Sequence, residues 1–317
     1  MGEKEHYIEL MVADGTPPTR IDTWVSQQVP TFPRSAASDQ RTQFFINGKK
    51  VKKSKTIQAK DAVSIIWTED VMGPLVGEDL PLDILYEDDH ILVINKQQGL
   101  VVHPGFNNWD GTLVHALIYR YGTSFFSGEN ESEGEEDTEI ALRPGIVHRL
   151  DKETSGVMVV AKDSESQLNL SAQFKARTTE KYYIALVWGQ LPATQGVIET
   201  TLIRDRRNRK RFCVGKDDEG RLSVTEYEVL RQYYDVSLVR IRLITGRTHQ
   251  IRVHMLHLGC PIVGDPIYGR RKKSTDGATL MLHAFSLALS HPVSAKRMVF
   301  RAPLAQRFKT YLGKMRD

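Results

Sequence analysis

Apolar residues in the first 70 positions follow the spacing of one short helix and several strands. Within residues 20–29, four apolar side chains fall on one helical face: Ile21, Trp24, Val25 and Val29. Asn47-Gly48 stands between apolar residues, which predicts a tight hairpin turn, and Ala62–Trp67 predicts a closing strand. These elements predict a small α+β domain over residues 1–70. A linker is expected over 71–81, which holds two glycines and two prolines.

From Leu82 onward, groups of predicted strands are interrupted by occasional helices. Strands are expected at Ile91–Ile94, Gly156–Ala161, Ile184–Trp188, Val197–Leu202 and Val239–Leu243. Helices are expected at Leu113–Tyr121, Glu165–Lys175, Thr248–Leu258 and Leu304–Leu312. Because the strands come in groups and do not alternate strictly with helices, the pattern favours an α+β fold with a mainly antiparallel mixed sheet over residues 82–317.

Local signals refine three of these elements. Ser164 followed by Gln167 predicts a capping box at the start of the second helix. Gly259 is placed to end the third helix. Arg240 and Arg242 alternate with apolar residues, which predicts a strand with a basic outer face.

Composition excludes membrane, secreted and fibrous proteins. No apolar run approaches the roughly 20 residues that a membrane helix needs, and the charged N-terminal residues do not form a secretory signal. The two cysteines, Cys213 and Cys260, cannot build a disulfide framework and fit a reducing compartment. We therefore expect a cytoplasmic protein.

The net charge of +4 hides a strongly basic chain. Ser127–Ile140 carries seven acids and no base, so the other residues carry +11. This acidic stretch is poor in apolar residues and is expected to be a disordered surface insertion. Basic residues gather at Lys49–Lys55, Arg204–Arg211 and Arg270–Lys273. Any one cluster could be a solvated loop, but three together predict an extended polyanion partner, most simply nucleic acid.

The densest group of reactive residues is Arg143–Gly156, with the sequence RPGIVHRLDKETSG. Asp151 lies at the mouth of the apolar strand that follows and close to Arg149 and Lys152. A carboxylate that is partly desolvated and close to a cation can act as a nucleophile or as an acid/base. The alternative is a simple ion pair within the loop.

A second group, Thr245–Asp265, combines a core-packed helix with a cationic face. His249 and Arg252 are three residues apart, and Arg247 precedes the helix, so this face could hold phosphate or pair with a buried acid. His249, His254 and His257 match no standard zinc spacing, and no nucleotide-binding loop or serine-hydrolase elbow occurs. The residues alone thus predict a two-domain RNA- or DNA-binding protein with Asp151 as the best candidate nucleophile.

Four ordered motifs resemble those of the RluA/RluD-type pseudouridine synthases. GIVHRLDKETSG (Gly145–Gly156) resembles the family signature, whose HRLD aspartate corresponds to Asp151. KYYIALVWG (Lys181–Gly189) and LITGRTHQIRVHMLHLGCPIVGD (Leu243–Asp265) follow in the family's order. VINKQQGLVVHPG (Val93–Gly105) resembles the first motif but has Gln97 where the family usually has proline. The resemblance covers roughly Leu82–Leu312.

The resemblance implies isomerisation of uridine to pseudouridine within RNA, without cofactor or metal. Asp151 would be the nucleophile, attacking either the anomeric carbon or carbon 6 of the base. Arg252 would pair with Asp151 and keep it ionised. Tyr183, selected over Tyr182 by the family's K-x-Y spacing, would lie against the uracil ring and take part in removing the carbon 5 proton. Arg149 would fill the space left by the flipped uridine.

The same resemblance extends the predicted RNA contacts. In the catalytic domain these are His148, Arg149, Arg247 and His249. The N-terminal domain resembles the small αL-type RNA-binding domain of a small-subunit ribosomal protein through Arg20-Ile21-Asp22, Arg34-Ser35 and the stretch that begins at Ile46. Its hairpin would present Lys49, Lys50, Lys52 and Lys53 to phosphates.

Large-subunit ribosomal RNA, mature or within a pre-ribosome, is the favoured substrate, and tRNA is the alternative within the same chemistry. A non-catalytic RNA-binding or ribosome-assembly factor is a further alternative. A glycoside or nucleoside hydrolase is disfavoured because a convincing second carboxylate is lacking. We expect a monomer.

Overall fold

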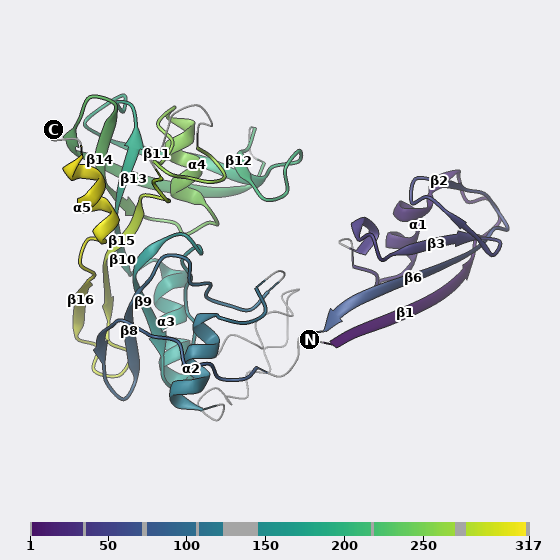
Figure 1. Ribbon diagram of the computed structural model, residues 1–317, viewed down its shortest axis with the longest axis horizontal. Helices are drawn as coiled ribbons and strands as arrows, with labels where there is room; N and C mark the ends of the chain where they lie inside the picture. Colours follow the sequence, from purple (N-terminus) through teal and green to yellow (C-terminus); the bar gives the residue numbers. More distant parts are fainter. Residues whose placement is uncertain are drawn as a thin grey trace. The chain divides into compact units, whose positions relative to one another are not determined.

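The computed structural model describes residues 2–33, 36–71, 75–105, 108–122, 145–216, 219–269 and 277–314. The chain divides into two compact units, Met1–Leu75 and Val76–Asp317 (Figure 1). Several segments discussed above lie outside the described residues: Arg34-Ser35, the acidic stretch 127–140, Arg143-Pro144 and the basic cluster 270–273.

The first unit is a four-stranded sheet with a helix packed on it. The strand order is β1 (Gly2–Met11), β6 (Ala62–Val71), β3 (Gln43–Ile46) and β4 (Lys49–Val51). β2 (Thr19–Arg20) and β5 (Thr56–Ile57) form a separate pair, and β2 contacts α1 (Ile21–Gln28). The short 3-10 helix η1 (Ala36–Ser38) contacts β6. Asn47 and Gly48, both with positive φ, make the predicted turn of the β3–β4 hairpin. β1 has no counterpart among the predicted elements.

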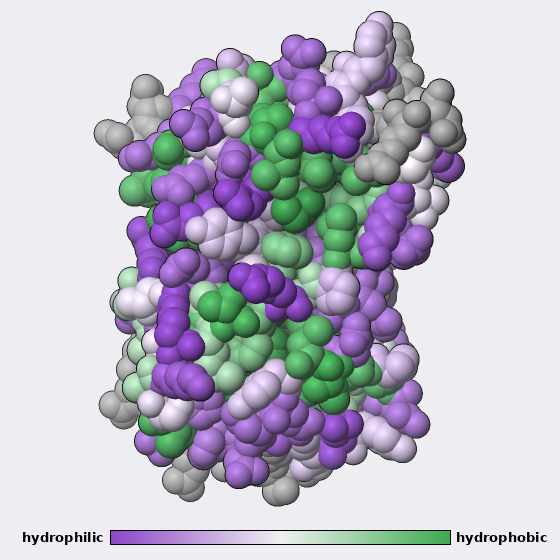
Figure 2. All heavy atoms as spheres, turned by 90° about the vertical axis from the view of Figure 1, so that its left-hand side faces the viewer, coloured by the Kyte–Doolittle hydropathy of each residue, from purple (hydrophilic) through white to green (hydrophobic). Residues whose placement is uncertain are grey.

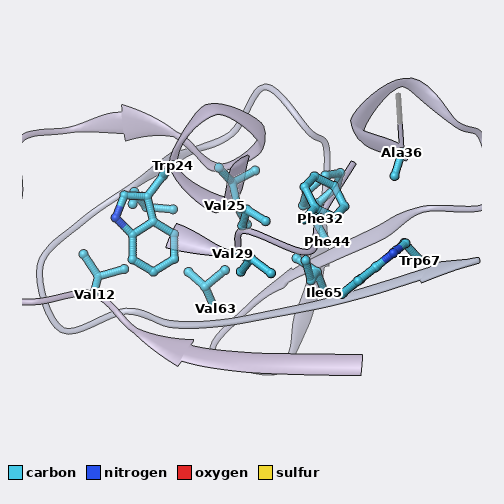
Figure 3. Close-up of a cluster of buried hydrophobic side chains, with 12 residues drawn as sticks. Val12, Trp24, Val25, Val29, Phe32, Ala36, Phe44, Val63, Ile65 and Trp67 are labelled. Carbon is cyan, nitrogen blue, oxygen red and sulfur yellow. The ribbon is translucent and has the colours of Figure 1, made fainter. Parts of the chain in front are cut away.

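The core of this unit joins α1 to the sheet. Trp24 and Val25 point from the helix towards Val63, Ile65 and their neighbours on β6 (Figure 3). The apolar face predicted for residues 20–29 is therefore the buried face, since Ile21, Trp24, Val25 and Val29 are all buried.

The second unit is built on a ten-stranded sheet. Its order is β12-β11-β13-β14-β10-β15-β9-β8-β7, and β16 also pairs with β15. The strands are β7 (Ile84–Glu87), β8 (Ile91–Lys96), β9 (Ser155–Ala161), β10 (Glu180–Trp188), β11 (Gln195–Arg204), β12 (Phe212–Val214), β13 (Arg221–Gln232), β14 (Val236–Leu243), β15 (Leu282–Ser290) and β16 (Arg297–Arg301). Only the β9–β15 pairing is parallel among the pairings described. The expected α+β fold with a mainly antiparallel mixed sheet is confirmed.

The described residues of this unit form four α-helices beside the sheet: α2 (Leu113–Tyr121), α3 (Ser164–Ala176), α4 (Gln250–His257) and α5 (Gln306–Gly313). α3 lies beside β9 (Figure 1), and its Leu170 joins the core formed by the apolar side chains of β8 and β9. On the face shown in Figure 2, apolar patches interrupt a largely hydrophilic surface.

Helix ends follow local chemistry, with one correction. The N-cap of α3 is Asp163, whose side chain accepts a hydrogen bond from the Ser166 backbone N–H, so the prediction of Ser164 as the cap was one residue too late. Gly259, with φ +75°, follows α4 as predicted. The Gly259 and Cys260 backbone N–H groups donate to the carbonyls of Leu256 and Met255, which is the Schellman pattern.

Two further expectations are corrected by packing. The outer face of β14 is not simply basic, because Arg240 and Arg242 pair with Glu228 and Glu226 across the ladder to β13. Residues 76–81, expected as linker, belong to the second unit: the Glu78 N–H donates to the His115 carbonyl of α2, and its carboxylate accepts from the Gly111 N–H.

Within the described part of the chain, none of the helices combines the length and apolar character needed to cross a membrane.

Candidate active site

Asp151 lies in the loop that leads into β9, and this loop is fixed from both sides. The backbone N–H of Thr154 donates to the Asp151 carbonyl, and the Gly99 N–H donates to the Lys152 carbonyl. Lys96, which is buried, donates from Nζ to three carbonyls: Gln97, Leu100 and Lys152. Burial lowers the Lys96 pKa to about 8, although the charges of Asp151 and Glu153 oppose this shift. Residues of the motif Val93–Gly105 thus fix the loop that carries Asp151 through these hydrogen bonds.

The segment before α4 is held by one buried amide. Gln250 accepts from the Thr245 hydroxyl and the Arg247 N–H through Oε1, and donates to the Val224 carbonyl and the Thr225 hydroxyl through Nε2. Sequence reasoning did not single out Gln250. The sequence did contain one indication of its role, because Gln250 lies on the inward side of the helix. A glutamine buried there needs hydrogen-bond partners for both the oxygen and the nitrogen of its amide.

Arg252 brings two carboxylates together. Its Nε and Nη2 each donate to Asp265 at 2.8 Å, and its Nη1 donates to Asp151 Oδ2 at 3.2 Å. The side chains of Arg252 and Asp265 are 3% and 0% exposed, whereas Asp151 is 25% exposed. Asp265 also accepts the N–H groups of Ile267 and Tyr268. Asp265, to which the sequence analysis gave no role, fixes the guanidinium, while Asp151 remains open to solvent.

For both Arg252 and Asp265, hydrogen bonding and opposite charge shift the pKa more than burial does. Burial lowers the Arg252 pKa, but the hydrogen bonds and charge of Asp265, with those of Asp151, raise it overall. Burial raises the Asp265 pKa, but the hydrogen bonds from Arg252 lower it overall. Both groups therefore stay charged at neutral pH.

His249 approaches Asp151 from the start of α4. Its Nε2 is 3.8 Å from Asp151 Oδ2, and its Nδ1 is 2.9 Å from the Tyr268 hydroxyl. That hydroxyl also accepts the Phe212 N–H at 2.8 Å, and in the tautomer in which it donates its own proton to Nδ1 the ring proton is on Nε2. Burial lowers the His249 pKa despite the attraction of Asp151. The expected imidazole is neutral and directs an N–H towards the carboxylate.

A pocket of about 100 Å³ opens above Asp151. It collects most of the predicted site residues: Arg149, Asp151, Tyr183, Arg247, His249 and Arg252. Tyr183 on β10 is buried, and both burial and the charge of Asp151 raise its pKa. The described residues that line the pocket include one carboxylate, that of Asp151.

The other predicted residues lie elsewhere. His148 does not line this pocket: its Nε2 accepts the Val159 N–H, and its ring stacks on Phe174 with centroids 4.5 Å apart. Burial lowers the His148 pKa to about 3, so it is neutral. Lys49, Lys50, Lys52 and Lys53 are exposed in the first unit. Among the described residues, no three His, Cys, Asp or Glu side chains are grouped so as to hold a metal ion.

Comparison with known proteins shows the family of this chain. A family profile described as RNA pseudouridylate synthase matches residues 90–257. The chain is 40% identical over 276 residues to the ribosomal large subunit pseudouridine synthase D of Borreliella burgdorferi, which covers 85% of this chain and 82% of the relative. The chain belongs to the RNA pseudouridylate synthase family. The predicted resemblance is confirmed, and the protein is an isomerase.

Other relatives agree with this assignment. The enzyme of the same name from Xanthomonas campestris is 36% identical over 325 residues, covering 98% of this synthase and 92% of the relative. Among solved structures, human RNA pseudouridylate synthase domain containing 4 matches with a TM-score of 0.57 and 27% identity, covering 74% of this synthase and 93% of that chain.

Proposed function

We propose that this synthase isomerises uridines of large-subunit ribosomal RNA, with Asp151 as the nucleophile. The observation that carries the assignment of Asp151 is its position as the carboxylate of the pocket, 3.2 Å from an arginine that Asp265 holds in place. Support for the substrate comes from relatives named as ribosomal large subunit pseudouridine synthases at 36–41% identity.

The proposed reaction conserves all atoms of the nucleotide. Asp151 attacks the anomeric carbon or carbon 6 of the base, the N-glycosidic bond breaks, and the base rotates. A bond then forms between the sugar and carbon 5, and the bond to Asp151 breaks, which regenerates the carboxylate. The proton on carbon 5 leaves to solvent, and N1 of the base gains one. Arg252 stabilises the Asp151 carboxylate before attack and whenever it leaves again.

In this proposal Tyr183 contacts the uracil base, and Arg149 fills the space that the flipped uridine leaves in the RNA stack. The Tyr183 ring lies in the pocket wall, where it would pack against uracil. Because burial raises the Tyr183 pKa, its hydroxyl is protonated at neutral pH and can donate a hydrogen bond to the bound base. Arg149, exposed at the pocket, would occupy the space left when the uridine flips out of its stack.

The first unit is proposed to bind RNA as an αL-type domain, with residues 1–70 as its extent. Its β3–β4 hairpin and the following turn carry four exposed lysines: Lys49, Lys50, Lys52 and Lys53. Among the described residues, Lys50 Nζ donates a hydrogen bond to Gln43 Oε1 at 2.8 Å. Such cations suit phosphates of a structured RNA.

Tritium release tests the proposal. RNA labelled at uridine carbon 5 is offered as large-subunit rRNA fragments and, separately, as bulk tRNA. We expect release from rRNA by wild type and none by Asp151→Asn, which keeps RNA binding. Preferred release from tRNA would overturn the substrate, substantial activity of Asp151→Asn would overturn the nucleophile, and free uracil would indicate hydrolysis. Binding without any release would favour a pre-ribosomal substrate or a non-catalytic role.

A further inference from the structure

A basic groove of about 820 Å³ continues from the pocket above Asp151, which we call the uridine pocket after the proposed substrate. The two cavities share several lining residues, among them Arg149, Tyr183 and Arg247. Seven cationic side chains line the groove: Arg149, Lys175, Arg177, Lys181, Arg204, Arg221 and Arg247. The described lining contains no carboxylate. A groove with this composition attracts an anion that runs on from the pocket.

Three of these arginines come from separate elements and meet in the groove wall. Arg177 ends α3 in the left-handed conformation, Arg221 begins β13, and Arg247 precedes α4. For none of the three do the described residues supply a carboxylate within ion-pair distance, in contrast to Arg240 and Arg242 on the neighbouring strand. The fold therefore brings three positive charges together without matching them.

Arg247 carries the clearest sign of a missing partner. Its Nε is buried, and no group of the described residues accepts its hydrogen. Leaving a buried donor unpaired costs about 1–3 kcal/mol, and more for a charged group. Burial, followed by the charges of Arg221 and Arg177, lowers the Arg247 pKa. The same repulsion acts on Lys181, whose pKa is lowered by burial and by Arg177. An anion bound against these guanidinium groups would relieve the repulsion.

A phosphodiester has the chemistry that fits. It carries one negative charge and two non-bridging oxygens, which match the parallel N–H donors of guanidinium groups. A nucleotide in the uridine pocket is joined to its neighbours through such groups, and the continuous cavity gives them a path.

We propose that Arg177, Arg221 and Arg247 form a binding site for a backbone phosphate of the RNA strand that enters the uridine pocket. This inference rests on the proposed function and deepens it, because it assigns the residues that hold the strand outside the reacting nucleotide. Arg177 and Arg221 line the groove but not the pocket, so they act on binding and not on chemistry.

The test uses the full-length Arg177→Gln/Arg221→Gln variant, since both side chains are exposed and Arg247 is left in the pocket. The matched control is Lys296→Gln/Lys309→Gln, which removes two exposed cations of the same unit outside the groove. The dissociation constant for an rRNA fragment is measured by filter binding between 50 and 300 mM salt, and the single-turnover rate is measured at saturating RNA.

We expect the groove variant to bind about tenfold more weakly at 100 mM salt and to lose about 0.7–0.9 from its log–log salt slope, as for one phosphate contact. Its rate at saturation stays within about twofold of wild type, and the control variant matches wild type in both. Equal affinity and slope in the groove and control variants would overturn the site.

A chemical probe locates the phosphate. Neutral methylphosphonate linkages are placed singly on either side of the target uridine. One linkage should weaken wild-type binding about tenfold and have no further effect on the groove variant, since both changes remove the same contact. Additive losses at every linkage would refute the assignment. Because binding is read directly, an RNA that binds but forms no pseudouridine counts against the proposed substrate alone.

Discussion

Nη1 of Arg252 donates to Oδ2 of Asp151 at 3.2 Å, from a guanidinium whose Nε and Nη2 already donate to Asp265. The bidentate hydrogen bonds to Asp265, both 2.8 Å, set the plane and position of this group before any substrate enters. Since Asp265 is fully buried and anchored by two backbone N–H groups, the arginine has little freedom to follow a moving ligand. The fold thus holds a fixed positive charge beside the more exposed carboxylate.

Replacing Arg252 by lysine should reduce the single-turnover rate by about 100-fold or more, because one ammonium cannot span both carboxylates. RNA affinity should change little, since Arg252 is 3% exposed. Rapid-quench measurement of pseudouridine formation at saturating RNA checks this. Arg242→Lys, on β14 outside the pocket, is the control and should keep the wild-type rate. An unchanged rate in Arg252→Lys would contradict the pairing role.

Replacing Tyr268 by phenylalanine should free Nδ1 of His249. The variant loses the hydroxyl that links this nitrogen to the Phe212 N–H. Burial lowers the His249 pKa in the wild type, and we expect that pKa to rise in the variant because protonation of the ring becomes easier. We expect turnover to fall about tenfold, with unchanged RNA affinity and an acid limb of the pH–rate profile moved to higher pH. Tyr182→Phe is the control. A uniform loss at all pH values would mean that Tyr268 is only structural.

Buried neutral histidines should make stability fall in acid. His254 is fully buried between the hydroxyls of Thr200 and Thr225, and burial lowers its pKa to about 4. The unfolded chain takes up a proton below about pH 6.5 and the native state only below about 4, so stability is complete above 6.5 and falls through that window. The contribution is about 3 kcal/mol. Urea unfolding at pH 7.0 and 4.5 should show a smaller loss for His254→Gln than for wild type; identical losses would refute it.

Gly156 should tolerate no side chain. Its φ is +118°, and a Cβ there would lie 2.1 Å from the Ala284 carbonyl oxygen, where β9 and β15 pair in parallel. Gly156→Ala should therefore cost roughly 3 kcal/mol or more of unfolding free energy. Gly99→Ala is the matched control, since Gly99 also has positive φ but open space around it, and should cost about 1 kcal/mol. Equal losses in urea unfolding would show that the close approach is relieved by small shifts.

The lysines of the first unit should contribute to RNA affinity and not to stability. Changing Lys49, Lys50, Lys52 and Lys53 to glutamine should weaken binding at least tenfold and reduce the salt slope, because all four are exposed. Lys4→Gln/Lys60→Gln in the same unit is the control. Filter binding and thermal unfolding measure the two effects. Binding as tight as that of the control would remove the hairpin from the RNA interface.

Secondary structure could be predicted from the sequence wherever one short pattern of residues dominates. The helix Leu113–Tyr121 was predicted with the bounds it has, and Asn47-Gly48 and Gly259 were found in the turn and helix end they predict. β13 was missed because its buried positions include the polar residues Ser223 and Thr225, so residue polarity does not mark its buried face. β1 was missed because Glu3, Lys4 and Glu5 give its first residues no apolar alternation, whereas in the fold they pair with β6.

The sequence by itself determined the α+β class and the motif family, and it predicted Asp151 as the nucleophile. What only the tertiary structure decided is which groups meet it. Arg252 is 101 residues from Asp151, and Asp265 and Tyr268 come later still. Periodicity tells which face of an element is buried, but not which other element covers it. Here β15 inserts between β10 and β9, and this sheet order sets Tyr183 and the α4 arginine around one carboxylate.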